Sequence, residues 1–137
     1  MRCHQCKSES FVRRPVELVT DVGEVTVVDR TLGRPVCTQC GAYTIPADEG
    51  EAFEIRAAAK VLWHTERISG EMLRFARRAL GMTQAELGQE LGVTLETVSR
   101  WEREERAMEP WVRLAIFALV LKRTFAELEG LELKRAS

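Results

Sequence analysis

Residues 83–102, TQAELGQELGVTLETVSRWE, limit the possible folds of this chain more than any other stretch. Thr83 with Glu86 three positions later is the pattern of a capping box, which predicts that a helix begins here. Gly92 predicts where that helix ends, because the residue that follows a short helix commonly needs a positive φ. The helix can direct three apolar side chains into a core, those of Ala85, Leu87 and Leu91.

A second short helix is predicted directly after this turn. Val93 can insert its apolar side chain beneath the turn, and Thr94 can cap the helix LETVSRWE. Val98 and Trp101 lie three positions apart and therefore share one face. Two short helices joined by a tight glycine turn form a helix-turn-helix, whose second helix commonly enters the major groove of DNA. An ordinary helical hairpin is the alternative, but the caps, the turn glycine and the core positions all fall in register.

The charge of the chain limits how strongly such a unit can bind DNA. The chain has 137 residues and a formal net charge of −1, and 30% of its residues are charged. Between residues 71 and 106, six arginines stand against seven glutamates. This balance predicts specific contacts of modest affinity per chain, which favours a homodimer on double-stranded DNA.

The sequence also argues against several classes of protein. It has no run of about 18 apolar residues that could span a membrane, and its first residues, MRCHQCKSES, lack the apolar core of a secretory signal. We therefore expect a cytoplasmic protein. A Gly-rich phosphate loop, a nucleophile elbow and a carboxylate pair at catalytic spacing do not occur, so we do not expect an enzyme.

Four cysteines form two Cys-x-x-Cys pairs, Cys3 with Cys6 and Cys37 with Cys40. Two such pairs commonly place four thiolates tetrahedrally around Zn²⁺. Four thiolates leave no open coordination position for a reacting water, so the predicted zinc site is structural. A redox dithiol, unmetallated thiols and an iron site are the alternatives. His4 lies inside the first pair and is expected to be exposed rather than a ligand.

The residues between the cysteine pairs predict a small β-hairpin module. Runs rich in β-branched residues at 16–20 and 25–28 predict two strands, and the sequence DVGE at 21–24 predicts the turn between them. A third short strand is predicted at 35–37. A module of about 45 residues buries too little apolar surface to fold alone. Zinc can stabilise it, since structural zinc sites in small peptides contribute roughly 10–16 kcal/mol.

A helix is predicted to connect this module to the helix-turn-helix region. It begins near Asp48, with Glu51 as the partner in a capping box, and it ends near Glu66. The Ser-Gly pair at 69–70 then interrupts the apolar pattern. We therefore predict two domains: a zinc-binding domain with its connecting helix at 1–67, and a DNA-binding and dimerisation domain at 68–137.

The second domain is predicted to hold five helices. The first spans 71–80, and three of its side chains are either solvated or near DNA phosphates: Arg74, Arg77 and Arg78. The two helices of the helix-turn-helix follow. A fourth helix begins at Pro110 and is apolar on nearly every face, which predicts either a self-association surface or close packing by a fifth helix. That last helix begins at Thr124 and carries Phe125, Leu128 and Leu131. The expected fold class is α+β, with a Cys₄ zinc-ribbon-like hairpin module, a connecting helix and an all-α domain.

The segment 83–102 resembles the core motif of the XRE/Cro-like repressors, whose DNA-binding domain has the lambda-repressor-like fold. The resemblance implies phosphate contacts by Gln84 and Arg103. It places Thr94 and Thr97 at the DNA backbone or at the edge of the groove. Three residues would face base edges: Leu95, Glu96 and Arg100. Their chemistry fits, because Arg can bond guanine, Glu can accept from cytosine N4 and Leu can touch a thymine methyl.

The order of the parts resembles the MqsA antitoxins, which join a YgiT-type zinc finger to an XRE-type domain. The resemblance rests most strongly on the four cysteines and on the segment Ser99-Arg100-Trp101-Glu102. The resemblance implies that the zinc module neutralises a toxin, commonly an mRNA-cleaving ribonuclease, and that the C-terminal domain dimerises on a palindromic operator and represses its own operon. The chain departs from the family patterns at Glu96, where Asn can occur, and at 104–105, where a polar residue and Gly are common. The alternative is a free-standing XRE-family regulator with a structural, metal-sensing or redox-sensing zinc domain.

Overall fold

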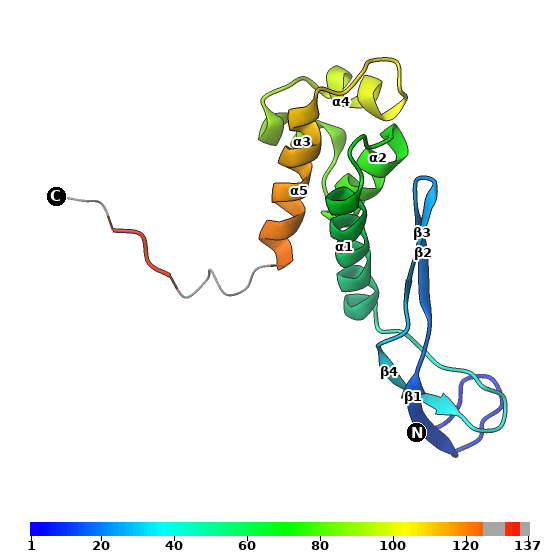
Figure 1. The fold of residues 1–137 in the computed structure, drawn as a ribbon. Helices are drawn as coiled ribbons and strands as arrows, with labels where there is room; N and C mark the ends of the chain where they lie inside the picture. Colours follow the sequence, from blue (N-terminus) through cyan, green and yellow to red (C-terminus); the bar gives the residue numbers. More distant parts are fainter. Residues whose placement is uncertain (125–130, 135–137) are drawn as a thin grey trace.

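The computed structural model describes residues 1–124 and 131–134 of the chain. Four short strands come first and five helices follow, which confirms the predicted α+β class (Figure 1). We call residues 1–45 the N-terminal lobe and residues 46–124 the helical lobe. Within the described residues, every helix is too short or too polar to cross a membrane.

Two antiparallel hairpins, one nested inside the other, form the N-terminal lobe. β1 (Phe11–Pro15) pairs with β4 (Gly33–Cys37), and β2 (Leu18–Val22) pairs with β3 (Val25–Asp29). The three strands expected from the sequence are present with slightly different bounds. Sequence analysis missed β1, because the segment FVRRP has no alternating apolar pattern, and all its side chains except that of Phe11 are exposed.

The tip of the β2–β3 hairpin touches the start of α2 (Gly70–Ala79). Gly23 turns the chain there with a φ of +62°, a conformation that favours glycine. A Cβ atom at this position would lie 2.9 Å from Met72 Cγ and 3.0 Å from Ser69 Oγ. The N-terminal lobe therefore contacts the helical lobe directly at the hairpin tip. Figure 1 shows the β2–β3 hairpin running alongside α1, with its tip beside α2.

α1 (Ala47–His64) runs between the hairpin and the other helices (Figure 1). The capping box expected at Asp48 and Glu51 is wrong. The N-cap residue is Pro46, and no side chain in the described part of the chain caps this end of the helix. The helix thus begins before Asp48, which lies in the first turn, where a carboxylate is favourable beside the helix N-terminus.

Two neighbouring faces of α1 pack on two different groups of apolar residues. Ala57 and Val61 join Val22 and Met72 in a cluster between the hairpin, α1 and α2. The adjacent face enters the main core of the helical lobe through Ala58 and Leu62. The helix that was expected to connect two domains is therefore also a core element of the helical lobe. The domain boundary between 67 and 68 stays a prediction.

The remaining helices follow α2 in short succession. They are α3 (Gln84–Leu91), α4 (Leu95–Glu102) and α5 (Pro110–Thr124). Thr83 and Glu86 form the expected capping box, and Gly92 ends α3 with a φ of 72°. The fifth helix predicted for this region, from Thr124 onward, falls mostly on residues 125–130, outside the described part of the chain.

The main core lies among α1, α2, α3, α4 and α5. Its buried residues include Leu73, Ala76, Leu87, Val98, Trp101, Val112, Ile116 and Val120. The expectation that Ala85 faces this core is wrong, because Ala85 is exposed. Gly88 is the buried small residue instead, and a Cβ atom there would lie 2.8 Å from the backbone oxygen of Val93. A glycine at this position lets α3 approach the turn that leads into α4.

Candidate functional site

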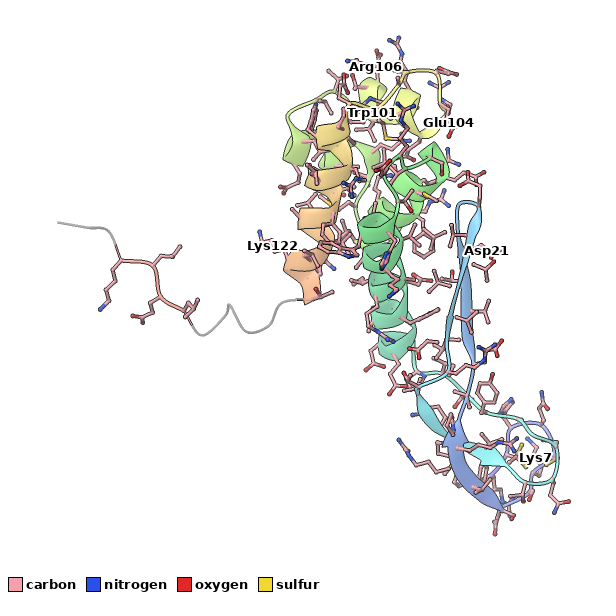
Figure 2. The ribbon with its side chains drawn as sticks, viewed as in Figure 1. Lys7, Asp21, Trp101, Glu104, Arg106 and Lys122 are labelled. Atoms are coloured by element: carbon pink, nitrogen blue, oxygen red, sulfur yellow. The ribbon has the colours of Figure 1, made fainter. Side chains whose placement is uncertain are left out.

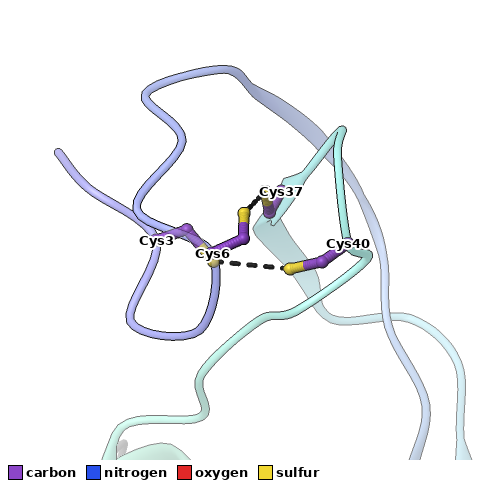
Figure 3. A group of neighbouring side chains, drawn as sticks. All are labelled: Cys3, Cys6, Cys37 and Cys40. Carbon is purple, nitrogen blue, oxygen red and sulfur yellow. Dashed lines mark hydrogen bonds between the residues drawn. The ribbon is translucent and has the colours of Figure 1, made fainter.

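Two tight turns bring the four cysteine side chains together (Figure 3). Cys3 and Cys6 lie before β1, whereas Cys37 ends β4 and Cys40 follows it. The Sγ atoms of Cys3 and Cys40 lie 3.5 Å apart, and so do those of Cys6 and Cys37. All four Sγ atoms lie within 4.8 Å of one another. The structure thus brings together the four residues that sequence analysis singled out as metal ligands.

The two cysteine turns repeat one backbone pattern. The N–H of Lys7 donates to the oxygen of Cys3 at 3.0 Å, and the N–H of Gly41 donates to the oxygen of Cys37 at 2.9 Å. Lys7 and Gly41 both have positive φ angles, 66° and 78°. Glycine adopts this conformation freely, whereas in a lysine it costs about 1–2 kcal/mol. Such strain persists where the surrounding structure over-determines it, which marks the first turn as a constrained site.

The arrangement of the sulfur atoms fits a tetrahedral metal ion. Four thiolates about 2.3 Å from Zn²⁺ would lie roughly 3.8 Å from one another. The observed separations, from 3.5 Å up to at most 4.8 Å, bracket that value. All four cysteines are free thiols rather than disulfides. The cluster could therefore hold one metal ion with a closed coordination shell, as a structural site requires.

The pKa values of the thiols also favour a bound metal ion. The backbone N–H of Cys40 lowers the pKa of Cys37 to about 6. The backbone N–H of Ala42 lowers the pKa of Cys40, but burial and the three other thiols outweigh it and raise that pKa to about 12. Four thiolates this close repel one another, and a bound cation removes the repulsion, because metal-coordinated thiols are deprotonated. The cluster is therefore better suited to a divalent cation than to four free thiolates.

α4 lies at the opposite end of the molecule from the cysteine turns (Figure 1). Its inner face carries Val98 and Trp101, both of which are buried. The three side chains expected to read bases are all exposed: Leu95, at 49%, Glu96 and Arg100. An apolar, an acidic and a basic side chain are thus presented together on the outer face of one short helix.

The other predicted DNA contacts take part in local hydrogen bonds at the ends of α4. Thr94 caps the helix, since its Oγ1 accepts from the N–H of Thr97 at 3.2 Å and lies 3.0 Å from Thr97 Oγ1. Arg103 donates to the backbone oxygen of Ser99 at 3.4 Å and pairs with Glu105 at 2.9 Å. The roles of Thr94, Thr97 and Arg103 at the DNA backbone stay predictions.

A buried ion pair that sequence analysis missed joins α4 to α2. The side chain of Glu102 is 0% exposed and accepts two hydrogen bonds from Arg77, at 2.8 and 2.9 Å. Arg74 donates to the same carboxylate at 3.2 Å. The expectation that Arg77 is solvated or near phosphate is therefore wrong, because its guanidinium is held in this pair and also donates to the backbone oxygen of Met82. The pair sets how α4 is oriented relative to α2.

Gln84 also takes part in this network. It is half-buried, and its Nε2 donates to Glu102 Oε1 at 3.3 Å. Burial raises the pKa of Glu102, but the hydrogen bonds from Arg77, Gln84 and Arg74 outweigh it and leave that pKa below its usual value. The carboxylate thus stays ionised inside the core. The predicted contact between Gln84 and a DNA phosphate stays a prediction, and it would start from a side chain already oriented by Glu102.

Glu104 lies in the segment 104–105, where the chain departs from the XRE pattern. Its φ is +59°, a value that favours glycine at this position. Its Oε1 accepts from the backbone N–H of Gly70 at 3.0 Å. A Cβ atom on Gly70 would collide with the backbone oxygen of Glu102. The end of α4 and the start of α2 are therefore in backbone contact, and the glutamate adds a hydrogen bond that a glycine could not.

Comparison with known families agrees with this geometry. Residues 73–108 match a family model described as helix-turn-helix. These residues form an XRE-type helix-turn-helix. The matched range contains every side chain predicted to contact DNA and both members of the Arg77–Glu102 pair. No curated protein sequence matches the chain. The match supports a DNA-binding regulator and covers the part of the helical lobe from α2 to the loop after α4.

Proposed function

We propose that this protein is a cytoplasmic, non-enzymatic repressor that also acts as the antitoxin of a type II toxin–antitoxin system. A homodimer would bind a palindromic operator through α4, and the N-terminal lobe would bind and neutralise a toxin, in our proposal an mRNA-cleaving ribonuclease. The observation that carries the DNA-binding part is the outer face of α4, where Leu95, Glu96 and Arg100 are exposed within a matched helix-turn-helix.

In this proposal α4 enters the major groove, and the buried network behind it fixes its angle. Arg100 would bond a guanine through two N–H groups, Glu96 would accept from a cytosine and Leu95 would contact a thymine methyl. Two copies of α4 in a dimer, about 34 Å apart, would read half-sites one helical turn apart. Because the motif carries more glutamates than arginines, specificity depends on these few contacts rather than on general attraction to phosphates.

The toxin-binding part is supported by the resemblance in domain order and by the surface of the β2–β3 hairpin. Val19 and Val28 lie directly opposite each other on the two strands. They are 53% and 40% exposed. Exposed apolar pairs of this kind are available to a protein partner. A metal ion in the cysteine cluster would hold together the end of the lobe from which this hairpin extends, and so present that surface as a rigid unit.

The proposal is tested by two measurements on the full chain. A mobility-shift assay with the DNA upstream of its own gene should show binding that survives a large excess of unrelated DNA. Co-expression with each neighbouring gene should yield one toxic product whose toxicity this protein abolishes and which co-purifies with it. Specific DNA binding with no such partner would contradict the antitoxin part. Equal affinity for unrelated DNA would contradict the repressor part.

A metal-responsive regulator without a toxin is the second candidate, and one contact favours it. The hairpin tip at Gly23 touches Ser69 and Met72 at the start of α2, next to the backbone contact between Gly70 and α4. The effect of metal binding in the N-terminal lobe would therefore be transmitted through these contacts to α4, the helix proposed to enter the major groove. Operator affinity that rises severalfold on zinc addition would favour this candidate, whereas unchanged affinity would favour the antitoxin.

A further inference from the structure

A groove of about 600 Å³ runs along the surface of the helical lobe, between the second half of α1 and the second half of α5. Its apolar lining includes Trp63 from α1, and Phe117 and Leu121 from α5. The ring of Trp63 lies against that of Phe117, with the ring centroids 5.5 Å apart, yet 66% of Trp63 is exposed. Tryptophan is among the residues that contribute most to protein interfaces. This exposed apolar surface therefore indicates a binding site for a polypeptide segment.

The rim of the groove is basic. It includes the side chains of Arg56, Lys60 and His64, and no acidic residue of the described part of the chain lines the groove. Arg56 is already paired with Asp29, whereas Lys60 forms no ion pair among the described residues. Packing two copies of this face against each other would bring basic side chains together, and like charges repel. The groove is therefore better suited to an occupant that is both apolar and acidic.

The C-terminal part of the chain has this composition. We call residues 131–134, with the sequence LELK, the C-terminal arm. Leu131 and Leu133 are 69% and 101% exposed. Residues 125–134 together contain three glutamates and one lysine. In an extended segment, Leu131 and Leu133 share one face and Glu132 lies on the other. The two leucines can therefore enter an apolar groove while Glu132 stays at its mouth, beside the basic rim.

The C-terminal arm lies away from the groove of its own chain. Figure 1 shows residues 131–134 at a distance from α1 and α5, and Figure 2 shows their side chains apart from those of the rest of the molecule. Six residues, 125–130, separate the arm from Thr124, which lines the groove. A connection of this length can span at most about 24 Å, which is enough to reach a neighbouring molecule.

We propose that the C-terminal arm of one copy occupies the groove between α1 and α5 of a second copy, and that the exchange is reciprocal. A two-fold axis then makes the two contacts identical, as in a closed dimer. Leu131 and Leu133 would cover Trp63, and Glu132 would pair with Lys60. Because α4 lies near the beginning of α5, at the other end of that helix, its outer face stays free in both copies (Figure 1).

This exchange supplies the contacts of the homodimer in the function proposed above. It rests on that function only for the role of the dimer, because the dimer can be measured without DNA. Each copy contributes one arm and one groove. A change in either part should therefore weaken the dimer, although the two parts lie on different segments of the chain.

The exchange is tested by analytical ultracentrifugation of the full chain without DNA. The wild type should dimerise. Two variants should raise the dissociation constant of the dimer about tenfold or more: an arm variant, Leu131→Ser with Leu133→Ser, and a groove variant, Trp63→Ser. Both variants change exposed side chains, so circular dichroism should show that they stay folded. A monomeric wild type, or an arm variant that dimerises as tightly as the wild type, would overturn the proposal.

Leu114→Ser is the matched control. Leu114 is 56% exposed on α5 but does not line the groove, so this variant should dimerise as the wild type does. If Leu114→Ser dissociated the dimer and the arm variant did not, the two copies would meet through α5 directly, and the proposed exchange would be wrong.

Mixing the two variants separates exchange between copies from docking of the arm on its own chain. The groove variant keeps an intact arm and the arm variant keeps an intact groove, so together they regain one of the two contacts. An equimolar mixture should therefore form a heterodimer whose dissociation constant is about tenfold lower than that of either variant alone. A mixture that is as monomeric as its components would refute exchange between copies.

Failure of this proposal and failure of the proposed function give different results. A wild type that exchanges its arms but does not bind the DNA upstream of its own gene would contradict the repressor and leave the exchange in place. A monomeric wild type that binds this DNA specifically would contradict the exchange and leave DNA recognition in place.

Discussion

The two lobes of this molecule are held together by different kinds of interaction. In the helical lobe, side chains from five helices share one apolar core, and a buried ion pair crosses it. The N-terminal lobe has few buried apolar residues: Val16, Leu18, Val22 and Val36, besides Cys3 and Cys37. Most side chains of β1 are exposed and most of β4 are only half-buried. We therefore expect the end of this lobe that carries the thiols to depend on a metal ion for its stability, whereas the helical lobe depends on apolar packing.

The two kinds of interaction predict which change destabilises each lobe most. Loss of a metal-coordinating cysteine should unfold the N-terminal lobe, which has almost no core of its own, whereas the helical lobe, with its large core, should stay folded. Loss of a buried charge partner should be costly in the helical lobe. The β2–β3 hairpin and α1 are the places where the two kinds of stabilisation meet, since Val22 and Ala57 pack together in one cluster.

The largest expected effect is on metal binding and on the N-terminal lobe. The variant Cys37→Ser removes one of four thiolates, and we expect loss of the bound ion and unfolding of residues 1–45, because structural zinc sites contribute roughly 10–16 kcal/mol. Metal content and circular dichroism measure this. His4→Ala is the control, since His4 is exposed, and it should keep one ion per chain. Full metal content in Cys37→Ser would contradict the four-thiolate site.

A smaller but still large effect is expected from the buried ion pair. Glu102→Ala leaves the guanidinium of Arg77, whose side chain is 10% exposed, without its partner. We expect the free energy of unfolding to fall by about 3–5 kcal/mol in denaturant titration. The contribution of the ionised Glu102 carboxylate to the free energy of unfolding is present at pH values above the ordinary pKa of the group. It is lost as the pH falls through the lowered pKa of Glu102 in the folded state.

Two further variants test whether this loss of stability arises because a buried charge has lost its partner. Glu105→Ala breaks the pair with Arg103, in which both side chains are 52% exposed, and should cost at most about 1 kcal/mol. The double variant Arg77→Met with Glu102→Leu removes both charges and should recover most of the lost stability. If Glu102→Ala were as mild as Glu105→Ala, the buried pair would not hold α4 in place.

The effect expected on DNA recognition is smaller again. Arg100→Ala should weaken binding to the operator by about 1–3 kcal/mol and reduce discrimination at one base pair, because a bidentate contact to guanine is lost. Arg14→Ala is the control: Arg14 is also exposed but lies on β1 in the N-terminal lobe, far from α4. Unchanged operator affinity of Arg100→Ala in a mobility-shift assay would mean that α4 does not read the groove.

The smallest effect concerns the contact between the lobes. Thr31 and Arg56 hold the pKa of Asp29 at about 2, below its ordinary value of 3.8. The resulting stability, roughly 1–2 kcal/mol, is present above the ordinary pKa and is lost as the pH falls toward the lowered one. Asp29→Asn should therefore be less stable than the wild type at neutral pH, and the difference should vanish near pH 2. Asp21→Asn, on the exposed part of the hairpin, is the control. A difference that grew on acidification would refute the assignment.

Local sequence patterns predicted the parts of the structure that depend on local geometry. The spacing of the cysteines predicted which four thiols meet, because two tight turns on paired strands leave little freedom. The pattern at Thr83 and Glu86 predicted the start of α3. The same pattern at Asp48 and Glu51 gave a wrong prediction, because the N-cap residue of α1 is Pro46, two positions before Asp48. Helix caps thus depend on where neighbouring residues let the helix begin.

The buried network was missed because sequence analysis assigned arginines to the surface. A signal was present: Arg77 lies on the same stripe of α2 as Leu73 and Leu80, both of which are buried. Glu102 likewise lies one turn after buried Val98. Opposite charges at core positions of two helices indicate a buried pair, but their contact depends on how the helices pack. The strand β1 was missed for a related reason, since its partner β4 stabilises it rather than any apolar pattern of its own.

The most direct test of this account is amide hydrogen exchange along the full chain before and after chelation of the metal. The account predicts that residues 1–45 lose protection and that α2 to α5 keep theirs. α1 should keep protection where Ala58 and Leu62 enter the helical core. Protection lost in both lobes together would contradict the claim that a metal ion holds one lobe and an apolar core the other, and so would protection retained at the cysteine turns.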